Sequence, residues 1–282
     1  MTITGMTDPA PFADQRIIRI SDPQDERLAP YRDIRERDLV GREGRFIAEG
    51  KVVLNVLLSN PAFAAESLLI LENRLAGLSE QLKLCPPDVP IYCVSRDTMD
   101  AIAGFPMHRG ILAIGRRNNP LSIDPLLAAM PERALVVVLC GISNHDNMGS
   151  IFRNAAAFEA DCIIMDTTSC DPLYRKSIRV SVGATLQVPF AQGGSIETIA
   201  DRLAEDGFSL FALSPAGTMS IYEARPPLRT AILLGTEGEG LPKPLLQRLQ
   251  SVRIPMSQRF DSLNVATASG IALSRFSRFC GS

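Results

Sequence analysis

The stretch NHDNMGSIFRNAA at 144–156 brings an amide, a hydroxyl and a guanidinium close together, on Asn147, Ser150 and Arg153. It follows the apolar run ALVVVLCGI, whose length and lack of alternation predict a buried strand. In open α/β sheets, ligands bind where such strands end and the next helices begin. The pattern therefore indicates a binding or catalytic site, although most strand-to-helix turns only reverse the chain.

A second candidate segment is the glycine-rich turn in AILLGTEGEGLPKPLL at 231–246. Gly235, Gly238 and Gly240 allow the backbone to turn sharply and to approach a ligand closely. The segment lacks the GK[ST] of a phosphate-binding loop, and its glycine order differs from the dinucleotide-binding fingerprint. Taken alone, such a cluster is more often a turn than a cofactor site.

The third segment, VRIPMSQRFDSLNVATASGIALSRF at 252–276, combines the end of a strand, a polar loop and a helix rich in small residues. We expect the helix to begin near Leu263, with Ser262 as its N-cap. Asn264 adds a second polar group at the same helix start. The small residues predict that another element packs closely against this helix.

Strands and helices alternate along most of the chain, so the expected fold class is α/β. We expect an N-terminal extension at 1–30, a small α/β domain at 31–117, a linker at 118–133 and a larger domain at 134–282. In the larger domain, short strands without polar alternation predict a mostly parallel sheet that is covered on both faces. Its expected strands lie within 134–142, 162–166, 208–214, 231–237 and 251–256, and its expected helices span 150–160, 195–206 and 242–250.

Composition narrows the class of protein. A formal net charge of −2 and a pI near 5.8 argue against non-specific binding to a long nucleic-acid backbone, but they permit a local basic patch. Six cysteines without a CxxC pair and only two histidines argue against a metal site and for reduced thiols. We find no apolar run of about 20 residues and no secretory signal. We therefore expect a cytoplasmic protein with no metal and no membrane segment.

The three segments together resemble a known family. NMGSIFRNA, GTEGEGL and IPMSQRFDSLNVATASGI are similar, in order and spacing, to the three motifs of the SpoU (TrmH-like) branch of the SPOUT RNA methyltransferases. CDPLYRKSIRVSVGA at 170–184 resembles the segment between that family's first and second motifs. FIAEG at 46–50 and HRGILAI at 108–114 resemble the small ribosomal-protein-like substrate-binding domain that often precedes it.

The resemblance implies methyl transfer from S-adenosylmethionine to a ribose 2′-hydroxyl of structured RNA, with ribosomal RNA favoured over transfer RNA. It also implies a trefoil-knotted α/β domain and a homodimer. By matching position, the implied catalytic residues are Asn147, Arg153, Glu237, Ser262 and Asn264. The implied cofactor-binding residues are Leu234, Gly235, Ile254, Met256 and Leu263.

Chemistry constrains the role of Arg153. A guanidinium stays protonated at neutral pH and is a poor proton acceptor. We therefore expect Arg153 to hold an RNA phosphate and to stabilise the developing 2′-oxyanion, while the proton leaves to phosphate or water. A surface salt bridge is the alternative role for such a residue.

Two positions depart from the family pattern. Asn144-His145 stands where the first motif often has an Asp/Asn-Pro pair, and Gln258 stands where the third motif usually has glycine. His145 is a candidate base, although an ordinary loop histidine is the simpler interpretation. The departures leave a second hypothesis open, a non-catalytic RNA-binding or assembly factor that retains the fold. A nucleotide-dependent oxidoreductase is disfavoured, because no GxGxxG follows the first strand of the larger domain.

Overall fold

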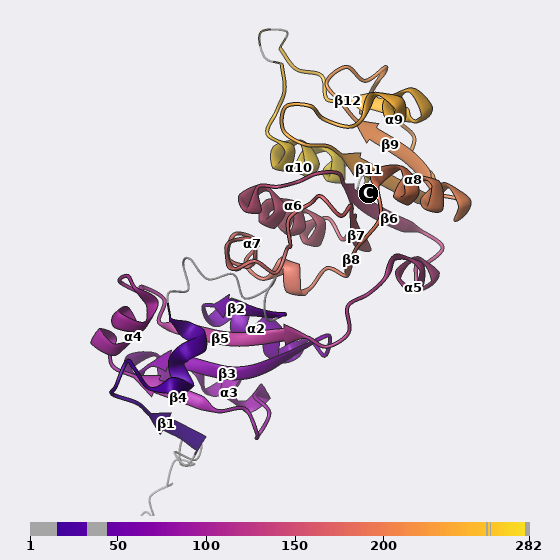
Figure 1. Ribbon diagram of the computed structural model, residues 1–282. Helices are drawn as coiled ribbons and strands as arrows, with labels where there is room; N and C mark the ends of the chain where they lie inside the picture. Colours follow the sequence, from indigo (N-terminus) through magenta and orange to yellow (C-terminus); the bar gives the residue numbers. More distant parts are fainter. Residues whose placement is uncertain (1–15, 33–43, 258, 260, 280–282) are drawn as a thin grey trace, which may run out of the picture. The chain divides into compact units, whose positions relative to one another are not determined.

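The computed structural model describes residues 16–32, 44–257, 259 and 261–279. By its internal contacts the chain divides into two compact units, residues 1–118 and 119–282 (Figure 1). Gln258 and the last of the six cysteines, Cys280, lie outside the described residues.

The first unit is built on a mixed five-stranded sheet with the order β1-β4-β3-β5-β2. β1 and β3 run parallel to β4, whereas β2 and β3 run antiparallel to β5. β1 falls within the segment that we expected to be an extension, and it instead forms an edge of this sheet. The elements are β1 (Ile17–Arg19), η2 (Glu26–Tyr31), β2 (Arg45–Glu49), α2 (Lys51–Ser59), β3 (Phe63–Leu71), η3 (Glu72–Leu78), α3 (Ser79–Leu84), β4 (Ile91–Val94), α4 (Arg96–Ala103) and β5 (Ile111–Arg117).

The second unit is built on a seven-stranded sheet with the order β10-β12-β9-β11-β6-β7-β8, in which all neighbours are parallel. Its strands are β6 (Ala134–Leu139), β7 (Cys162–Met165), β8 (Phe190–Gln192), β9 (Ser209–Leu213), β10 (Met219–Ser220), β11 (Arg229–Leu234) and β12 (Gln250–Arg253). Its helices are α5 (Ile123–Ala128), α6 (His145–Ala157), α7 (Arg175–Val180), η4 (Ala184–Leu186), α8 (Ile196–Glu205), α9 (Lys243–Arg248) and α10 (Val265–Phe276). This arrangement confirms the expected α/β class and parallel sheet.

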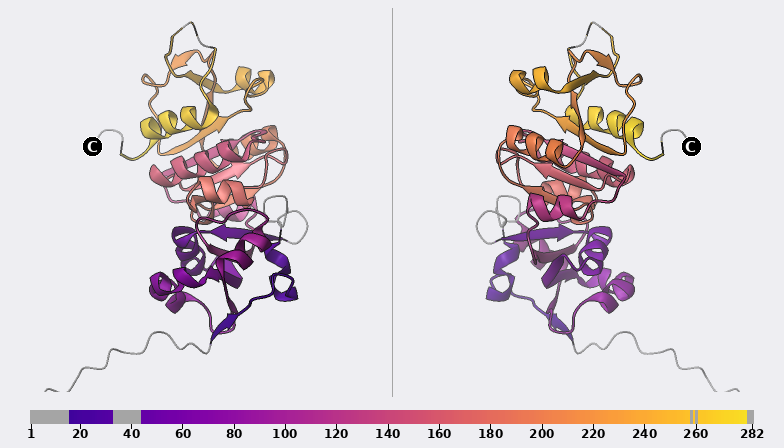
Figure 2. Two further views of the ribbon diagram at one scale, coloured as in Figure 1. Left: turned by 90° about the vertical axis from the view of Figure 1, so that its left-hand side faces the viewer. Right: turned by 90° about the vertical axis from the view of Figure 1, so that its right-hand side faces the viewer.

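Helices cover both faces of the parallel sheet. On one face, alternate strand residues such as Val136 and Leu233 pack with Leu203 of α8 and with residues of α5 and α9. On the other face, Phe276 of α10 meets Phe211 of β9 edge to face. α6 and α10 lie side by side on this second face (Figures 1 and 2). Because each strand is buried on both sides, β6 shows six consecutive buried residues and no alternation.

Two helix starts differ from the sequence expectations. α6 begins at His145 and not at 150, because Asn144 caps it by accepting hydrogen bonds from the amides of Asp146 and Asn147. The expectation of Ser262 as the cap of α10 was wrong. Asn264 is the N-cap, and its side-chain oxygen accepts from the amides that follow it at 266 and 267.

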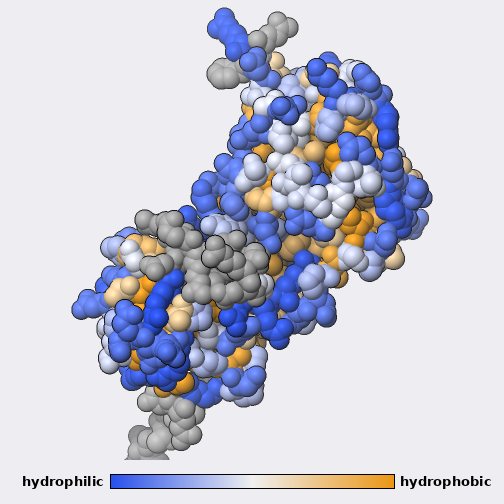
Figure 3. All heavy atoms as spheres, viewed as in Figure 1, coloured by the Kyte–Doolittle hydropathy of each residue, from blue (hydrophilic) through white to orange (hydrophobic). Residues whose placement is uncertain are grey.

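The segment 118–133 contains α5, whose Leu126 and Leu127 are buried in the core of the second unit. On the face that Figure 3 shows, hydrophilic residues cover most of the surface and hydrophobic residues form smaller patches. Within the described ranges, no helix is long and apolar enough to cross a membrane.

Candidate active site

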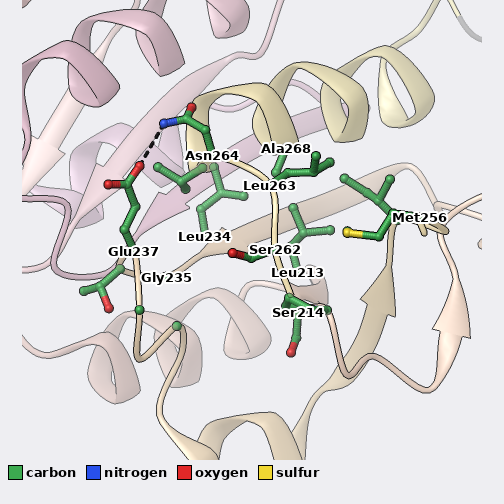
Figure 4. A pocket seen from close by; sticks show the side chains of 16 residues that line it. Leu213, Ser214, Leu234, Gly235, Glu237, Met256, Ser262, Leu263, Asn264 and Ala268 are labelled. Atoms are coloured by element: carbon green, nitrogen blue, oxygen red, sulfur yellow. Dashed lines mark hydrogen bonds between the residues drawn. The ribbon is translucent and has the colours of Figure 1, made fainter. Parts of the chain in front are cut away.

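A cavity of about 250 Å³ opens at the carboxyl ends of three neighbouring strands, β9, β11 and β12 (Figure 4). Four chain segments line it: 213–215 after β9, 234–240 after β11, Ile254 and Met256 after β12, and residues 262–268 around the start of α10. Strand order reverses beside it, since β6 is flanked by β7 on one side and by β11 on the other. Such a switch point is where open parallel sheets bind ligands.

The glycine-rich turn after β11 forms one wall of the cavity. A Cβ on Gly235 would lie 2.3 Å from the carbonyl carbon of Gly240, so glycine is required for the two ends of the turn to meet. Gly238 and Gly240 have φ values of +103° and +72°, which disfavour other residues. The turn is closed by a bridge between Thr236 and Gly240. Its backbone therefore approaches the cavity with few side chains in between.

Three polar residues, one from each motif, form a closed triangle beside the cavity. Nδ2 of Asn147 donates to Oε1 of Glu237 at 2.6 Å. Nδ2 of Asn264 donates to the same oxygen at 2.8 Å and to Oδ1 of Asn147 at 2.9 Å. Figure 4 shows the bond between Asn264 and Glu237. The triangle thus joins the first turn of α6 and the turn after β11 to the start of α10.

Asn264 takes part in two networks at once. Its side-chain oxygen caps α10, while its side-chain nitrogen makes both bonds of the triangle. An amide can do this because it carries an acceptor and two donors, whereas a serine hydroxyl has a single donor. The position of the triangle is therefore fixed by the start of the helix.

The turn after β6 is held from behind by the buried carboxylate of Asp166. This carboxylate accepts hydrogen bonds from the amide of Gly141 at 3.0 Å, from the hydroxyl of Thr168 at 2.6 Å, and from the amide and hydroxyl of Ser169. Burial raises the pKa of Asp166, but these hydrogen bonds outweigh burial and leave it below the ordinary value. Ser169 also accepts from the amide of Ile142, so the turn that leads to Asn147 is fixed at two successive amides.

The structure brings together nine of the ten residues that the resemblance implied. The five implied cofactor residues line the cavity: Leu234, Gly235, Ile254, Met256 and Leu263. Glu237, Ser262 and Asn264 line it as well, and Asn147 joins them through the triangle. Arg153 stands apart, because it is exposed on α6 and is not among the residues that line the cavity.

Sequence reasoning missed one wall of the cavity and the support behind the turn. The missed wall is 213–215, in the run FALSPAG after β9. Because parallel strands end at one edge of the sheet, the polar and proline residues after that strand were a usable signal. Asp166 was visible only as the last residue of an expected strand, and nothing in the sequence marks its bonds to Gly141. Among the described residues, no cluster of three or more metal-ligating side chains is present.

The residues present are chemically suited to a nucleoside with an attached positive charge. Leucine, isoleucine and methionine side chains supply flat apolar contacts, and the glycine turn supplies backbone donors and acceptors. Among the described residues that line the cavity, Glu237 is the only one with a charged side chain.

Comparison with known proteins agrees with this geometry. The model of the SpoU rRNA Methylase family matches residues 134–274. An uncharacterized tRNA/rRNA methyltransferase of Mycobacterium bovis is 39% identical over 262 residues, which cover 90% of this chain and 89% of the relative. A 23S rRNA (guanosine-2′-O-)-methyltransferase of Vibrio parahaemolyticus is 31% identical over 206 residues, which cover 72% of this chain and 82% of the relative. The structure of an AdoMet-bound rRNA methyltransferase from Sinorhizobium meliloti gives a TM-score of 0.77 at 22% identity, and the match covers 92% of this chain and 97% of that one.

The chain belongs to the SpoU rRNA methylase family, as its three motifs predicted. It is therefore an RNA methyltransferase, which confirms the expected enzyme class. S-adenosylmethionine is the cofactor of this family, and the Sinorhizobium meliloti protein with the same fold carries it.

Proposed function

We propose that this chain binds S-adenosylmethionine in the cavity at the ends of β9, β11 and β12 and methylates a ribose 2′-hydroxyl of ribosomal RNA. The observation that carries the proposal is the triangle of Asn147, Glu237 and Asn264 on the rim of that cavity. Three motifs that are far apart in the sequence meet there, beside the residues suited to the cofactor.

The cavity fits the cofactor in size and in chemistry. Its volume of about 250 Å³ is close to the lower limit of roughly 300 Å³ that is usual for small-molecule sites. Leu234, Ile254 and Leu263 supply apolar walls for the adenine, and the backbone around Gly235 supplies hydrogen-bonding groups. Bound there, S-adenosylmethionine supplies a methyl group on a positively charged sulfur. The carboxylate of Glu237 is the charged group of the wall that favours this positive charge.

Arg153 is suited to hold RNA and not the cofactor. Its side chain is exposed on α6, and it forms no ion pair with any residue in the described part of the chain. A guanidinium in this setting can hold a phosphate in a bidentate manner and stabilise a developing 2′-oxyanion. Most of the rate enhancement then comes from holding the hydroxyl in line with the methyl group. Ser262, on the cavity wall, is the nearby hydroxyl that can help to orient the ribose.

Ribosomal RNA is the proposed substrate because a relative that covers most of this chain is named for a guanosine 2′-hydroxyl of 23S rRNA. The Mycobacterium bovis relative is named for either tRNA or rRNA, so tRNA is the alternative substrate. The first unit is proposed to bind the RNA, as its resemblance to a substrate-binding domain implies. The trefoil knot also remains a prediction from the resemblance.

The homodimer is likewise a prediction. A groove of about 840 Å³ between α6 and α10 is its candidate interface, and the small residues of α10, including Gly270, lie along it. A second copy seated there would cover Gly270 and Ile271, as the small-residue pattern of this helix suggests.

Calorimetric titration of S-adenosylmethionine tests the proposal. Asn264→Ala removes one corner of the triangle and the cap of α10, and we expect at least tenfold weaker binding. Ser195→Ala is the matched control, because Ser195 caps α8 through the amide of Thr198 and lies outside the cavity lining. Both substitutions remove a helix cap, which costs about 1 kcal/mol of stability. A difference in S-adenosylmethionine affinity between the two variants therefore reports the loss of the triangle.

The expected result is one site per chain in the wild type and in Ser195→Ala, followed by transfer of a labelled methyl group to unmodified 23S rRNA transcribed in vitro. A 2′-O-methyl blocks alkaline cleavage of the adjacent phosphodiester, which locates the modified nucleotide. Absence of binding to the folded wild-type protein would reject the proposal and favour the non-catalytic RNA-binding factor.

A further inference from the structure

An aromatic pair connects the start of α6 to the start of α7 and takes no part in the triangle. His145 is the first residue of α6, and Tyr174 is the N-cap residue of α7. Their ring centroids are 4.2 Å apart and their planes are inclined by 32°, so the rings are stacked. Both residues are half-buried, which leaves part of the stack accessible to solvent. His145 lies two residues before Asn147 in the first turn of α6.

The pair is held in place by the packing of α7 on α6. The hydroxyl of Ser177 donates to the carbonyl of His145 at 3.1 Å, and Lys176 forms an ion pair with Asp146 at 2.6 Å. A Cβ on Gly149 would lie 2.6 Å from the carbonyl oxygen of Ser177, so glycine permits this close approach. The rings are therefore ordered before any ligand binds, which reduces the entropic cost of stacking on them.

The helix that follows Tyr174 is cationic, although Asp146 pairs with its lysine. α7 has the sequence RKSIRV and carries Arg175, Lys176 and Arg179 with no acidic residue. Lys176 and Arg179 are exposed, and Arg179 forms no ion pair within the described residues. Aromatic rings flanked by exposed cations are the composition of sites that bind single-stranded RNA, where bases stack on the rings and phosphates contact the cations.

We propose that the His145–Tyr174 pair is a stacking site for an unpaired base of the RNA substrate, and that Arg179 contacts the phosphates on either side of that base. This inference rests on the proposed function, because it assumes that the substrate is RNA. A base held there anchors the nucleotide chain at the start of α6, the helix that also carries Asn147 and Arg153. The alternative role for the pair is to attach α7 to α6 by packing alone.

Binding of short RNAs tests stacking without knowledge of the natural target. The two probes are a 20-nucleotide oligoadenylate and an abasic RNA of the same length, which has the same phosphates but no bases. We expect the wild type to prefer oligoadenylate, and Tyr174→Ala to reduce this preference by about 5- to 150-fold, the range that stacking of one base supports. Tyr174→Phe and His145→Phe keep an aromatic ring and should retain the preference.

Salt dependence separates the base site from the phosphate contacts. Arg179→Ala should weaken the binding of both probes by the same factor. It should also lower the slope of log affinity against log salt concentration by about one unit. Tyr174→Ala should leave that slope unchanged. Thermal melting and S-adenosylmethionine titration of each variant confirm that the fold and the cavity are intact.

Each outcome bears on one claim. A wild type without preference for bases, or a Tyr174→Ala variant that keeps the preference, would overturn the stacking site and leave the packing role. A base preference that depends on Tyr174 in a chain that fails to bind S-adenosylmethionine would support the stacking site while rejecting the proposed function.

Discussion

Gly235→Ala is the sharpest single test of the cavity. The added methyl group would lie 2.3 Å from the carbonyl carbon of Gly240, 2.4 Å from the amide nitrogen of Leu241 and 2.6 Å from the carbonyl oxygen of Gly240. All three are backbone atoms, so no side-chain rotation relieves the contact. Only opening of the glycine-rich turn relieves the contact, and the wall of the cavity then moves with the turn.

Overpacking of this kind typically costs about 1–3 kcal/mol. If the turn stays closed, the cost appears as stability, and for a domain of this size it lowers the melting temperature by roughly 2–4 °C per kcal/mol. If the turn opens, the cost appears as affinity, and about 1–3 kcal/mol weakens S-adenosylmethionine binding by roughly 5- to 150-fold. The sum of the loss in unfolding free energy and the loss in binding free energy is therefore better defined than either loss alone.

Two other glycines separate steric contact from backbone strain. Gly240 has a φ of +72°, and no atom lies within 4 Å of the place that a Cβ would take there, so Gly240→Ala introduces strain without a clash. We expect it to cost about 1–2 kcal/mol. Gly193 has neither a positive φ nor a neighbour within 4 Å, so Gly193→Ala should leave stability and binding unchanged.

The assay combines thermal melting with calorimetric titration of S-adenosylmethionine for all three variants. We expect the combined loss of unfolding and binding free energy to be largest for Gly235→Ala, smaller for Gly240→Ala and smallest for Gly193→Ala. A Gly235→Ala variant that melts within 1 °C of the wild type (an uncertainty of about 0.3–0.5 kcal/mol by the same conversion) and binds S-adenosylmethionine within twofold would refute the assignment of this turn as a rigid cavity wall.

Two further predictions concern buried ionisable groups. Asp166→Asn should destabilise the protein by about 1–3 kcal/mol, because an amide cannot accept all the bonds that the carboxylate accepts. The folded pKa of Asp166 is lowered, so this stabilisation is present above the unfolded value of about 3.9 and is lost as the pH falls through the lower folded value. Melting curves of the two proteins should therefore differ from pH 5 to 8 and begin to converge only below about pH 4. Burial raises the pKa of Cys140 and of Cys162 to about 12, so iodoacetamide at pH 8 should leave both thiols unmodified until the protein is unfolded, and alkylation of Cys162 in the native state by peptide mass spectrometry would contradict the buried position of β7.

The long strands of the second unit could be predicted because their burial on both faces leaves a direct signature. β6 is a run of apolar residues without alternation and lies within its expected segment, 134–142. β11 contains the apolar run AILL that was expected from 231, but the strand begins two residues earlier, at Arg229. β10 has two residues and β8 has three, too few for any period to show. Four of the first five residues of α6, the histidine, aspartate, asparagine and glycine of HDNMG, are weak helix formers, and the helix was expected only from Ser150. The cap at Asn144 and the packing of Gly149 against α7 override that weak propensity.

The sequence predicted which residues form the candidate site better than it predicted the hydrogen bonds between them. The resemblance implied that the motifs around 147, 237 and 264 form one site, and the parallel sheet explains the meeting of the first two, because its strands end at one edge. Which of Ser262 and Asn264 would cap α10 was not decidable, since both types are favoured caps. The second task of Asn264, donating to Asn147 and Glu237, depends on distances that no local pattern encodes.

The position of Arg153 shows how helix geometry limits a motif. Arg153 follows Asn147 by six residues, and at about 100° per residue the two side chains are roughly 120° apart around the axis of α6. Asn147 is buried and faces the triangle, so Arg153 must point away from it, and the structure places Arg153 in solvent. A motif that is continuous in sequence is thus divided between Asn147, which faces the triangle, and Arg153, which faces outward. Under the proposed function, Arg153 influences methyl transfer by holding a phosphate of an RNA strand whose ribose enters the cavity.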